Sequence, residues 1–569
     1  MATHTANGRG TAESTRERMT ATLREARPRP RAPWFPGLAG VKLAAALATR
    51  PDVLVRHGAA YGSELARIVA GRSEVAPKRS DRRFKDEGWQ HNPVLRRAMQ
   101  THLAAEHLAA ELVDDAELDW RSRERASLAG ENLLGALAPS NAPWLNPAVL
   151  KAAIDTGGLN FARGARNLLR DLRSRPALPS SVDPSGFTVG EDLAATPGSV
   201  VLRTEAFELI QYAPTTARVR ATPLLLCPQM INKYYVADLA PGKSMMEWAV
   251  GQGLTAFAMS WRNPGSDQAS WGWDTYAQAV LDALDAVEEV TGADATHVMG
   301  FCAGGTILAS VVAHLAATGR EDRIATMFLG VNALDMAGAG AGAAFLDDIS
   351  GAAAMAESRR RGYLGGESLA EVFAWMRPND MIWGYWVNNY LLGRRPPPFD
   401  ILYWNSDQTN MPAALHRDFV EQGLENSLVE PGGLEVLGTP VNLSDITVPT
   451  YLVAGIADHL VPWQSAYRTT QLIGSGDLRF VLSTSGHIAA MVNPPGNPKA
   501  NFKVNDAHPR RSRSWLEQSR TVEGSWWPDW TAWLAERSGP ERDAPAAPGS
   551  DGHPPLEDAP GTYVRAEAG

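Results

Sequence analysis

The sequence predicts an α/β protein in which a mostly parallel central sheet is covered by helices on both faces. From about residue 199 onward, short apolar runs bounded by turn residues alternate with longer stretches of helical periodicity. Parallel strands that are buried on both faces are apolar throughout, and helices are the usual connections between them. The chain has 569 residues, 44% of them hydrophobic, which is enough for a second domain.

Composition excludes several classes of protein. The net charge of −9 gives no general attraction to nucleic acid or to an anionic membrane, so any phosphate site has to be a local basic patch. The two cysteines, Cys227 and Cys302, are too few for a disulfide framework or a structural zinc site. No stretch approaches about 18 uninterrupted apolar residues, and residues 1–31 lack the apolar core of a secretory signal. We therefore expect a cytoplasmic protein without a membrane span.

The chain divides into segments of different composition. Residues 1–30, rich in Arg, Thr and Pro, are expected to form a disordered arm. Residues 31–196 predict a helical N-terminal domain that ends in a proline-rich linker. Residues 197–538 predict the α/β domain, with an inserted cap at about 333–446. Residues 539–569, heavy in Pro, Ala, Gly and Asp, are expected to be a flexible tail.

The α/β domain is predicted element by element. Its first two strands, 199–203 and 207–212, read as an antiparallel pair. The later strands are expected at 222–228, 254–260, 296–300, 324–331, 450–454 and 478–482. Helices are expected between them at 244–251, 275–290 and 304–317. There is no internal repeat.

The segment Gly300-Phe301-Cys302-Ala303-Gly304-Gly305 follows a predicted strand and precedes a predicted helix. This is the nucleophile-elbow pattern of the α/β-hydrolase fold, with cysteine in the place of serine. The glycines remove side chains that would collide at so sharp a turn, and the N-terminus of the following helix favours a thiolate. We predict that Cys302 is a nucleophile. Cys227 lies inside an apolar strand and is expected to be a core residue.

The acid and the base are expected on loops that follow later strands. In this fold the chain order is nucleophile, acid, histidine. Asp458 follows the strand 450–454 and His487 follows the strand 478–482, so they are predicted to complete the catalytic set. An imidazole activates the thiol, and a carboxylate on its other nitrogen holds the tautomer. His459, next to the acid, is the rival base and is treated as an auxiliary residue.

An oxyanion hole requires two backbone N–H groups near the nucleophile. One is expected from Ala303, directly after the nucleophile. The other is expected from the loop after the strand 222–228, at Gln229 or Met230, of which we favour Met230. A cysteine nucleophile keeps the acyl group as a thioester, which favours transfer to another nucleophile over simple hydrolysis.

Seven segments resemble those of polyhydroxyalkanoate synthases, occur in the same order as in that family, and span about residues 80 to 535. They are Asp81–Phe84 with Trp89 and Asn92-Pro93, Pro228–Tyr235 with Asp238-Leu239, Ser260–Pro264, Gly300–Gly305, Phe373–Asp380, Tyr403–Asn405, and Gly486–Ile488 with Asn493–Pro498. The stretch Trp375–Leu392 and the ending Ala559–Val564 look most like the class II, medium-chain-length type.

The resemblance implies an acyltransferase that polymerises (R)-3-hydroxyacyl-CoA into polyester and releases CoA. Cys302 would hold the growing chain and His487 would deprotonate it, while Asp458 would either orient His487 or activate the incoming 3-hydroxyl. No metal, redox group or other cofactor is implied, since CoA is the leaving group. The implied partners are a second copy of the chain, the surface of a polyester granule and granule-associated proteins.

Two alternatives remain open on the residues. A thiol-dependent hydrolase, either a thioesterase or an intracellular polyester depolymerase, would use the same nucleophile. A granule-binding protein without catalysis is the alternative of another class, and the presence of Cys302, Asp458 and His487 argues against it. The inserted cap is expected to act as a lid, and the tryptophans at 526, 527, 530 and 533 are expected to pack on the sheet.

Overall fold

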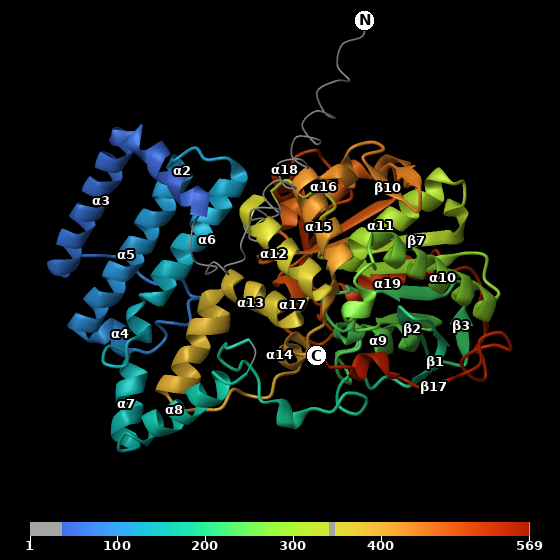
Figure 1. Ribbon diagram of the computed structural model, residues 1–569, viewed down its shortest axis with the longest axis horizontal. Helices are drawn as coiled ribbons and strands as arrows, with labels where there is room; N and C mark the ends of the chain where they lie inside the picture. Colours follow the sequence, from blue (N-terminus) through green and yellow to red (C-terminus); the bar gives the residue numbers. More distant parts are fainter. Residues whose placement is uncertain (1–36, 175, 339, 341–347, 568–569) are drawn as a thin grey trace, which may run out of the picture.

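Helices fill the N-terminal part of the chain, as the sequence predicts (Figure 1). The computed structural model describes residues 37–174, 176–338, 340 and 348–567, so the predicted arm at 1–30 lies outside the described residues. The helices are α2 (Gly37–Ala48), α3 (Pro51–Val69), α4 (Gly88–His91), α5 (Pro93–Asp115), α6 (Trp120–Ala136), α7 (Pro147–Asp155) and α8 (Leu159–Asp171).

Two of these helices begin at the same kind of dipeptide. The Asn92 side chain accepts hydrogen bonds from the N–H groups of Val94 and Leu95 at the start of α5, and Asn146 does the same for α7. Proline follows both asparagines, at a position where the missing N–H costs no helical hydrogen bond. The Asn92-Pro93 segment seen in the sequence is therefore a helix start.

The central sheet has eleven strands in the order β15-β14-β13-β12-β7-β6-β4-β5-β2-β1-β17. The six strands from β13 to β5 are mutually parallel, and the strands at both ends are antiparallel. The strands are β1 (Gly198–Arg203), β2 (Phe207–Tyr212), β4 (Leu224–Cys227), β5 (Ala256–Trp261), β6 (Thr296–Phe301), β7 (Ile324–Gly330), β12 (Thr450–Gly455), β13 (Leu478–Ser483), β14 (Asn501–Val504), β15 (Arg520–Glu523) and β17 (Glu557–Asp558). The mostly parallel sheet is thus confirmed.

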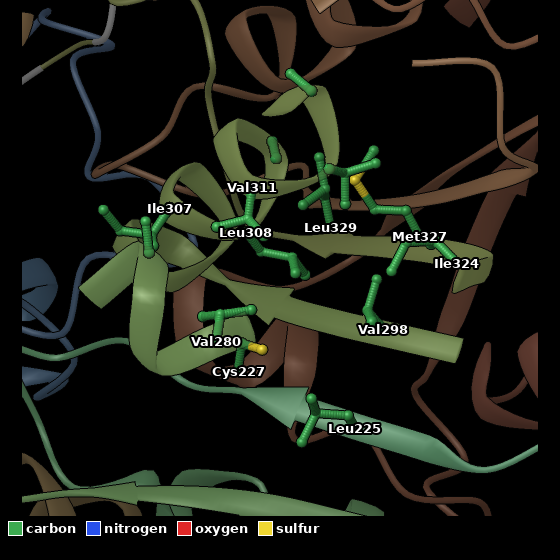
Figure 2. Close-up of a cluster of buried hydrophobic side chains, with 14 of the residues drawn as sticks. Leu225, Cys227, Val280, Val298, Ile307, Leu308, Val311, Ile324, Met327 and Leu329 are labelled. Carbon is green, nitrogen blue, oxygen red and sulfur yellow. The ribbon is translucent and has the colours of Figure 1, made fainter. Parts of the chain in front are cut away.

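Helices cover both faces of this sheet. One apolar cluster joins it to α10 (Trp273–Thr291), α11 (Cys302–Ala317), α16 (Trp463–Leu472) and α18 (Ser512–Gln518). Figure 2 shows part of this cluster, which includes Leu308 and Val311 of α11 together with Val298 and Leu329 of the sheet. A second cluster holds α9 (Met245–Gly251), α17 (His487–Met491) and α19 (Trp527–Ala535). No helix of the described residues is long and apolar enough to span a membrane.

The insertion after β7 forms a mainly helical cap, part of which, including Leu415 and Val436, belongs to the apolar core of the α/β domain. Its elements are α12 (Asp348–Arg361), β8 (Tyr363–Leu364), α13 (Gly366–Met376), η7 (Asn379–Trp383), η8 (Trp386–Leu391), α14 (Asp400–Ser406), β9 (Met411–Pro412), α15 (Ala413–Glu425), β10 (Leu434–Val436) and β11 (Thr439–Val441). Both η7 and η8 are π-helices. Such turns are rare, and they leave carbonyl groups that need other partners.

The C-terminal segment packs on the α/β domain, which contradicts the predicted flexible tail. β16 (Glu541–Asp543) pairs with β3 (Arg218–Arg220), and β17 pairs with β1. Beyond them, η11 (Tyr563–Arg565) places Val564 in the core with 2% of its surface exposed. The prediction from composition was wrong because strand pairing and the buried side chain of Val564 fix this largely polar segment on the α/β domain.

The tryptophans near the C-terminus are buried, as predicted. Trp526, Trp527 and Trp530 are at most 1% exposed, and Trp533 is 8% exposed. Trp526 stacks on Phe328 of β7 with ring centroids 5.6 Å apart. These side chains are core of the α/β domain and do not form a surface.

Candidate active site

Cys302 stands at the turn between β6 and α11. Its φ of 48° lies in the left-handed region, which costs a non-glycine residue about 1–3 kcal/mol and is usual where a site requires it. The thiol is partly exposed, whereas Cys227 in β4 is buried and its pKa is raised by burial. The structure thus separates the two cysteines as the sequence predicts.

Two glycines make room for the turn. A Cβ at Gly300 would stand 2.6 Å from the Cα of Gly305, and one at Gly304 would stand 2.4 Å from the carbonyl oxygen of Pro228. The same Pro228 oxygen accepts a hydrogen bond of 2.9 Å from the indole N–H of Trp261. The loop after β4 is therefore held directly against the elbow, where an oxyanion hole requires it.

Asn332 supports the elbow, and sequence reasoning missed it. Its amide Nδ2 donates to the carbonyl oxygen of Cys302 at 2.7 Å and to the hydroxyl of Thr306 at 2.9 Å. Asn332 follows the end of β7, next to Val331, whose φ is 45°. A polar residue directly after a buried parallel strand was the available signal, since all such strand ends meet at one edge.

His487 and Asp458 meet at the same edge of the sheet. β12 and β13 are parallel neighbours whose last residues, Gly455 and Ser483, are paired, so the two loops start side by side. His487 Nδ1 lies 2.7 Å from Asp458 Oδ2, and the side chains are 6% and 1% exposed. The predicted acid and base are therefore in direct contact, which leaves Nε2 of the imidazole for the nucleophile.

The carboxylate of Asp458 is fully engaged by groups of this chain. Its Oδ1 accepts hydrogen bonds from the backbone N–H groups of Leu460 at 2.9 Å and Val461 at 3.0 Å, and its Oδ2 binds His487. These contacts fix the orientation of the carboxylate and, through it, of the imidazole.

The pKa of His487 is raised. Burial lowers it, but the charge and hydrogen bond of Asp458, together with the Cys302 side chain, outweigh burial and raise the pKa to about 10. Cys302 is thus close enough to interact with the imidazole. An imidazolium next to the sulfur stabilises the thiolate, which is the reactive form.

His459 lies close enough to Asp458 and His487 for their charges to act on its imidazole. Burial, aided by the positive charge of Arg377, lowers the pKa of His459 to about 4. Within the described ranges, its Nδ1 is buried without a hydrogen-bond partner. Arg377 belongs to the cap, so charges of both the cap and the acid–base pair act on this imidazole.

The two predicted oxyanion donors lie on either side of the elbow. Ala303 is in the first turn of α11, where backbone N–H groups have no partner within the helix. Met230 lies in the loop after β4 and is 2% exposed, and no described backbone oxygen accepts from its N–H. Among the described residues there is no group of three or more His, Cys, Asp or Glu side chains that could bind a metal ion.

Comparison with known proteins agrees with this arrangement. The family model "Poly-beta-hydroxybutyrate polymerase (PhaC) N-terminus" matches residues 80–249, and the "alpha/beta hydrolase fold" model matches residues 222–494. Poly(3-hydroxyalkanoate) polymerase 2 from Ectopseudomonas oleovorans is 43% identical over 508 residues, which cover 89% of this chain and 90% of that protein.

One further sequence relative is highly similar to this chain, whereas a solved structure is only distantly similar. The poly(3-hydroxyalkanoate) polymerase subunit PhaC from Cupriavidus necator is 40% identical over 545 residues, 94% of this chain and 91% of that protein. A soluble variant of monoglyceride lipase from Saccharomyces cerevisiae is 11% identical, over 60% of this chain and 94% of that chain, and its TM-score of 0.35 is too low to add to the fold assignment. The sequence matches are long and specific, and the chain belongs to the poly(3-hydroxyalkanoate) polymerase family of the α/β-hydrolase fold.

Proposed function

We propose that this chain polymerises (R)-3-hydroxyacyl-CoA through a thioester on Cys302 and releases CoA. The observation that carries the proposal is the contact between His487 and Asp458 beside the Cys302 elbow, in a chain that belongs to a polymerase family. The roles of the individual residues follow from their positions and are part of the proposal.

The first step loads the acyl group. The Cys302 thiolate attacks the thioester carbonyl, and the N–H groups of Ala303 and Met230 bind the oxygen that becomes negative. The bond between the acyl carbon and the CoA sulfur then breaks. CoA leaves as a thiol after it takes the proton from the His487 imidazolium, whose raised pKa lets it store that proton.

The second step extends the chain. The imidazole of His487 is now neutral, and it takes the proton of the 3-hydroxyl of the next acyl-CoA. The hydroxyl oxygen attacks the Cys302 thioester, an ester bond forms, and the Cys302 thiolate is released with His487 protonated again. Attack of that thiolate on the new CoA thioester returns the longer chain to Cys302 and releases CoA.

Asp458 acts in this scheme through His487. Both of its oxygens are already bound, by His487 and by the backbone N–H groups of Leu460 and Val461, and its side chain is 1% exposed. These contacts support a positioning role over direct activation of the substrate hydroxyl. His459, with its pKa lowered to about 4, stays neutral and is an auxiliary residue at the edge of the site.

The proposal also covers partners and location. We infer that no metal or redox cofactor takes part, since the thiol and the imidazole supply the nucleophile and the proton transfers of both steps; activity should survive a chelator. A polyester that stays bound to Cys302 is insoluble in water, which supports a location on granules in the cytoplasm. A homodimer through the insertion at 333–446 is implied by the family resemblance, and sedimentation velocity with and without substrate tests it.

Purified protein with (R)-3-hydroxydecanoyl-CoA or (R)-3-hydroxybutyryl-CoA tests the function. We expect release of CoA together with turbidity and extractable polyester, and the preferred acyl length decides between medium-chain and short-chain use. The Cys302→Ala protein is the control and should release no CoA. Release of CoA with free hydroxy acid and no polymer would instead establish a thiol hydrolase.

A further inference from the structure

Helix α8 has the polarity of its faces reversed. Its buried residues recur at intervals of four, three and four and are polar or glycine: Asn160, Gly164, Asn167 and Asp171. Its apolar residues are exposed, with Leu159 at 64%, Leu169 at 56% and Leu172 at 58%. A helix that packs on a protein core shows the opposite pattern.

The buried row is explained by the cap. Asn160 Nδ2 donates to the carbonyl oxygen of Leu391 at 2.8 Å, and Asn167 Nδ2 donates to that of Asn389 at 2.9 Å. A Cβ at Gly164 would stand 1.8 Å from the carbonyl oxygen of Tyr390, so the two backbones touch there. α8 thus satisfies carbonyl groups of the π-helix η8, and this contact leaves its outer half without a partner among the described residues.

The outer half carries two adjacent rows. The apolar row consists of Ala162, Ala165, Leu169 and Leu172, and the basic row of Arg163, Arg166, Arg170 and Arg173. Each row has spacings of three, four and three, so each forms a stripe along the helix. A surface hollow runs along the boundary between the rows and is lined by Ala162, Ala165, Arg166, Leu169, Arg170 and Arg173.

The basic row is largely without ion-pair partners in the part of the chain that the structure describes. Among the described residues, no carboxylate lies within ion-pair distance of Arg163, Arg166 or Arg173. Arg170 donates to the side-chain oxygen of Asn167. In a chain with a net charge of −9, this is the local basic patch that an anion site requires.

Further apolar side chains outside the apolar row are also exposed. Ile154 at the end of α7 is 81% exposed, Phe161 is 41% exposed and Trp144 is 71% exposed. α7 and α8 lie together at one edge of the molecule in Figure 1, away from the sheet. The apolar surface therefore belongs to a projecting helical hairpin and not to the rim of the active site.

We propose that the α7–α8 hairpin binds the surface of an anionic phospholipid layer, with the apolar row of α8 in the acyl boundary and the basic row on the phosphates. A helix of this kind, apolar on one side and arginine-rich beside it, lies flat in a lipid interface. Charge complementarity selects anionic lipid over a neutral apolar surface. The inference goes beyond the proposed function and does not depend on the chemistry of Cys302.

Sedimentation with sucrose-loaded vesicles tests the proposal. The full chain should bind vesicles of mixed phosphatidylcholine and phosphatidylglycerol and should dissociate from them at high salt. It should not bind vesicles of phosphatidylcholine alone. The R166Q/R173Q variant should partition about thirtyfold less, because each arginine contributes about a factor of five at such a surface. The L169S/L172S variant should bind the same vesicles at least about tenfold more weakly, because two partly inserted leucines are removed.

Matched controls separate this surface from general charge and from catalysis. The R510Q/R511Q variant makes the same charge change beside α18, which lies away from α7 and α8 in Figure 1, and it should bind as the unaltered chain does. The Cys302→Ala protein should also bind, so a failure of catalysis and a failure of lipid binding are distinguishable. Circular dichroism and melting temperature report whether each variant is folded.

Several results would overturn the proposal. These are equal binding by R166Q/R173Q and the unaltered chain, undiminished binding by L169S/L172S, or binding to emulsified polyester particles but not to vesicles. A loss of dimers in L169S/L172S, seen by sedimentation velocity without lipid, would assign the surface to a second copy of the chain.

Discussion

Two helices of this molecule, α11 and α8, bury opposite kinds of side chain. α11 begins at Cys302 and buries twelve of its sixteen residues, among them Leu308 and Val311, in the core of the α/β domain. α8 buries Asn160, Asn167 and Asp171 and exposes Leu159 and Leu169. Both are regular helices, so the difference lies in what covers them.

The comparison shows that the partner decides which face of a helix is buried. α11 lies on the apolar side chains of a sheet, where burial of hydrocarbon is favourable. α8 lies on the backbone of a π-helix, where unpaired carbonyl groups require donors. Substitutions at the active-site end of α11 should have the largest effects, on activity. Those in the apolar body of α11, on the polar face of α8 and on the apolar face of α8 should have progressively smaller effects on stability.

Removal of the nucleophile should have the largest effect. Cys302→Ala is expected to lower the rate of CoA release by about 10⁴- to 10⁶-fold, since loss of a nucleophile leaves only binding and the oxyanion donors. Cys227→Ala, at the buried cysteine of β4, should retain activity within a few-fold. A thiol-labelling assay of both proteins would show which cysteine reacts, and an active Cys302→Ala protein would refute the mechanism.

Loss of the Asp458 carboxylate should come next. Asp458→Asn is expected to reduce CoA release by up to about 10⁴-fold, because the imidazole loses the partner that sets its tautomer. It should also lower the pKa of His487, since burial then acts without the opposing charge.

The pH dependence of stability provides a second test of the contact between His487 and Asp458. The folded pKa of His487 is about 10, above its ordinary value of 6.5, so the stability from this contact is fully present below pH 6.5 and is lost as pH rises through about 10. Urea unfolding across this range should show that loss in the unaltered chain and a smaller loss in Asp458→Asn. Parallel curves for the two proteins would contradict the ion pair.

Truncation within the body of α11 should destabilise the α/β domain. Leu308 is fully buried between the helix and the sheet (Figure 2), so Leu308→Ala is expected to reduce the free energy of unfolding by about 2–5 kcal/mol. Urea unfolding measures the change. Leu168→Ala, at a half-buried leucine of α8, is the matched control and should cost less.

Loss of a polar contact on α8 should have a smaller effect. Asn167→Ala leaves the carbonyl oxygens of Asn389 and Arg394 without the donor at 2.9 and 3.1 Å and should cost about 1–3 kcal/mol. Hydrogen exchange should show the loss in η8 and α8 but not in the central sheet. If α8 contacted η8 through apolar side chains, Asn167→Leu would be more stable than Asn167→Ala. We expect Asn167→Leu to be no more stable than Asn167→Ala.

The exposed leucines of α8 should have the smallest effect on stability. Leu169→Gln is expected to change the free energy of unfolding by less than about 0.5 kcal/mol, since the side chain is 56% exposed and has little burial to lose. A thermal melt in the absence of lipid checks this. A drop as large as that of Leu308→Ala would mean that the face is covered within the protein.

The sequence by itself determined the α/β domain and the residues of the proposed catalytic set. Apolar runs of strand length predict buried parallel strands, and the ends of such strands meet at one edge, so Cys302, Asp458 and His487 could be named from their places in the chain alone. The glycines at 300 and 304 added the sharp turn, because no other residue leaves room for it.

Tertiary structure alone decided the contacts that depend on backbone groups of distant segments. Asn332 on the carbonyl oxygen of Cys302, the buried polar row of α8 on η8, and the packed C-terminal segment are all of this kind. A side-chain pattern reports how much hydrocarbon a segment has to bury. It does not report which carbonyl or N–H groups elsewhere in the chain lack a partner, and those groups determine where polar residues are buried.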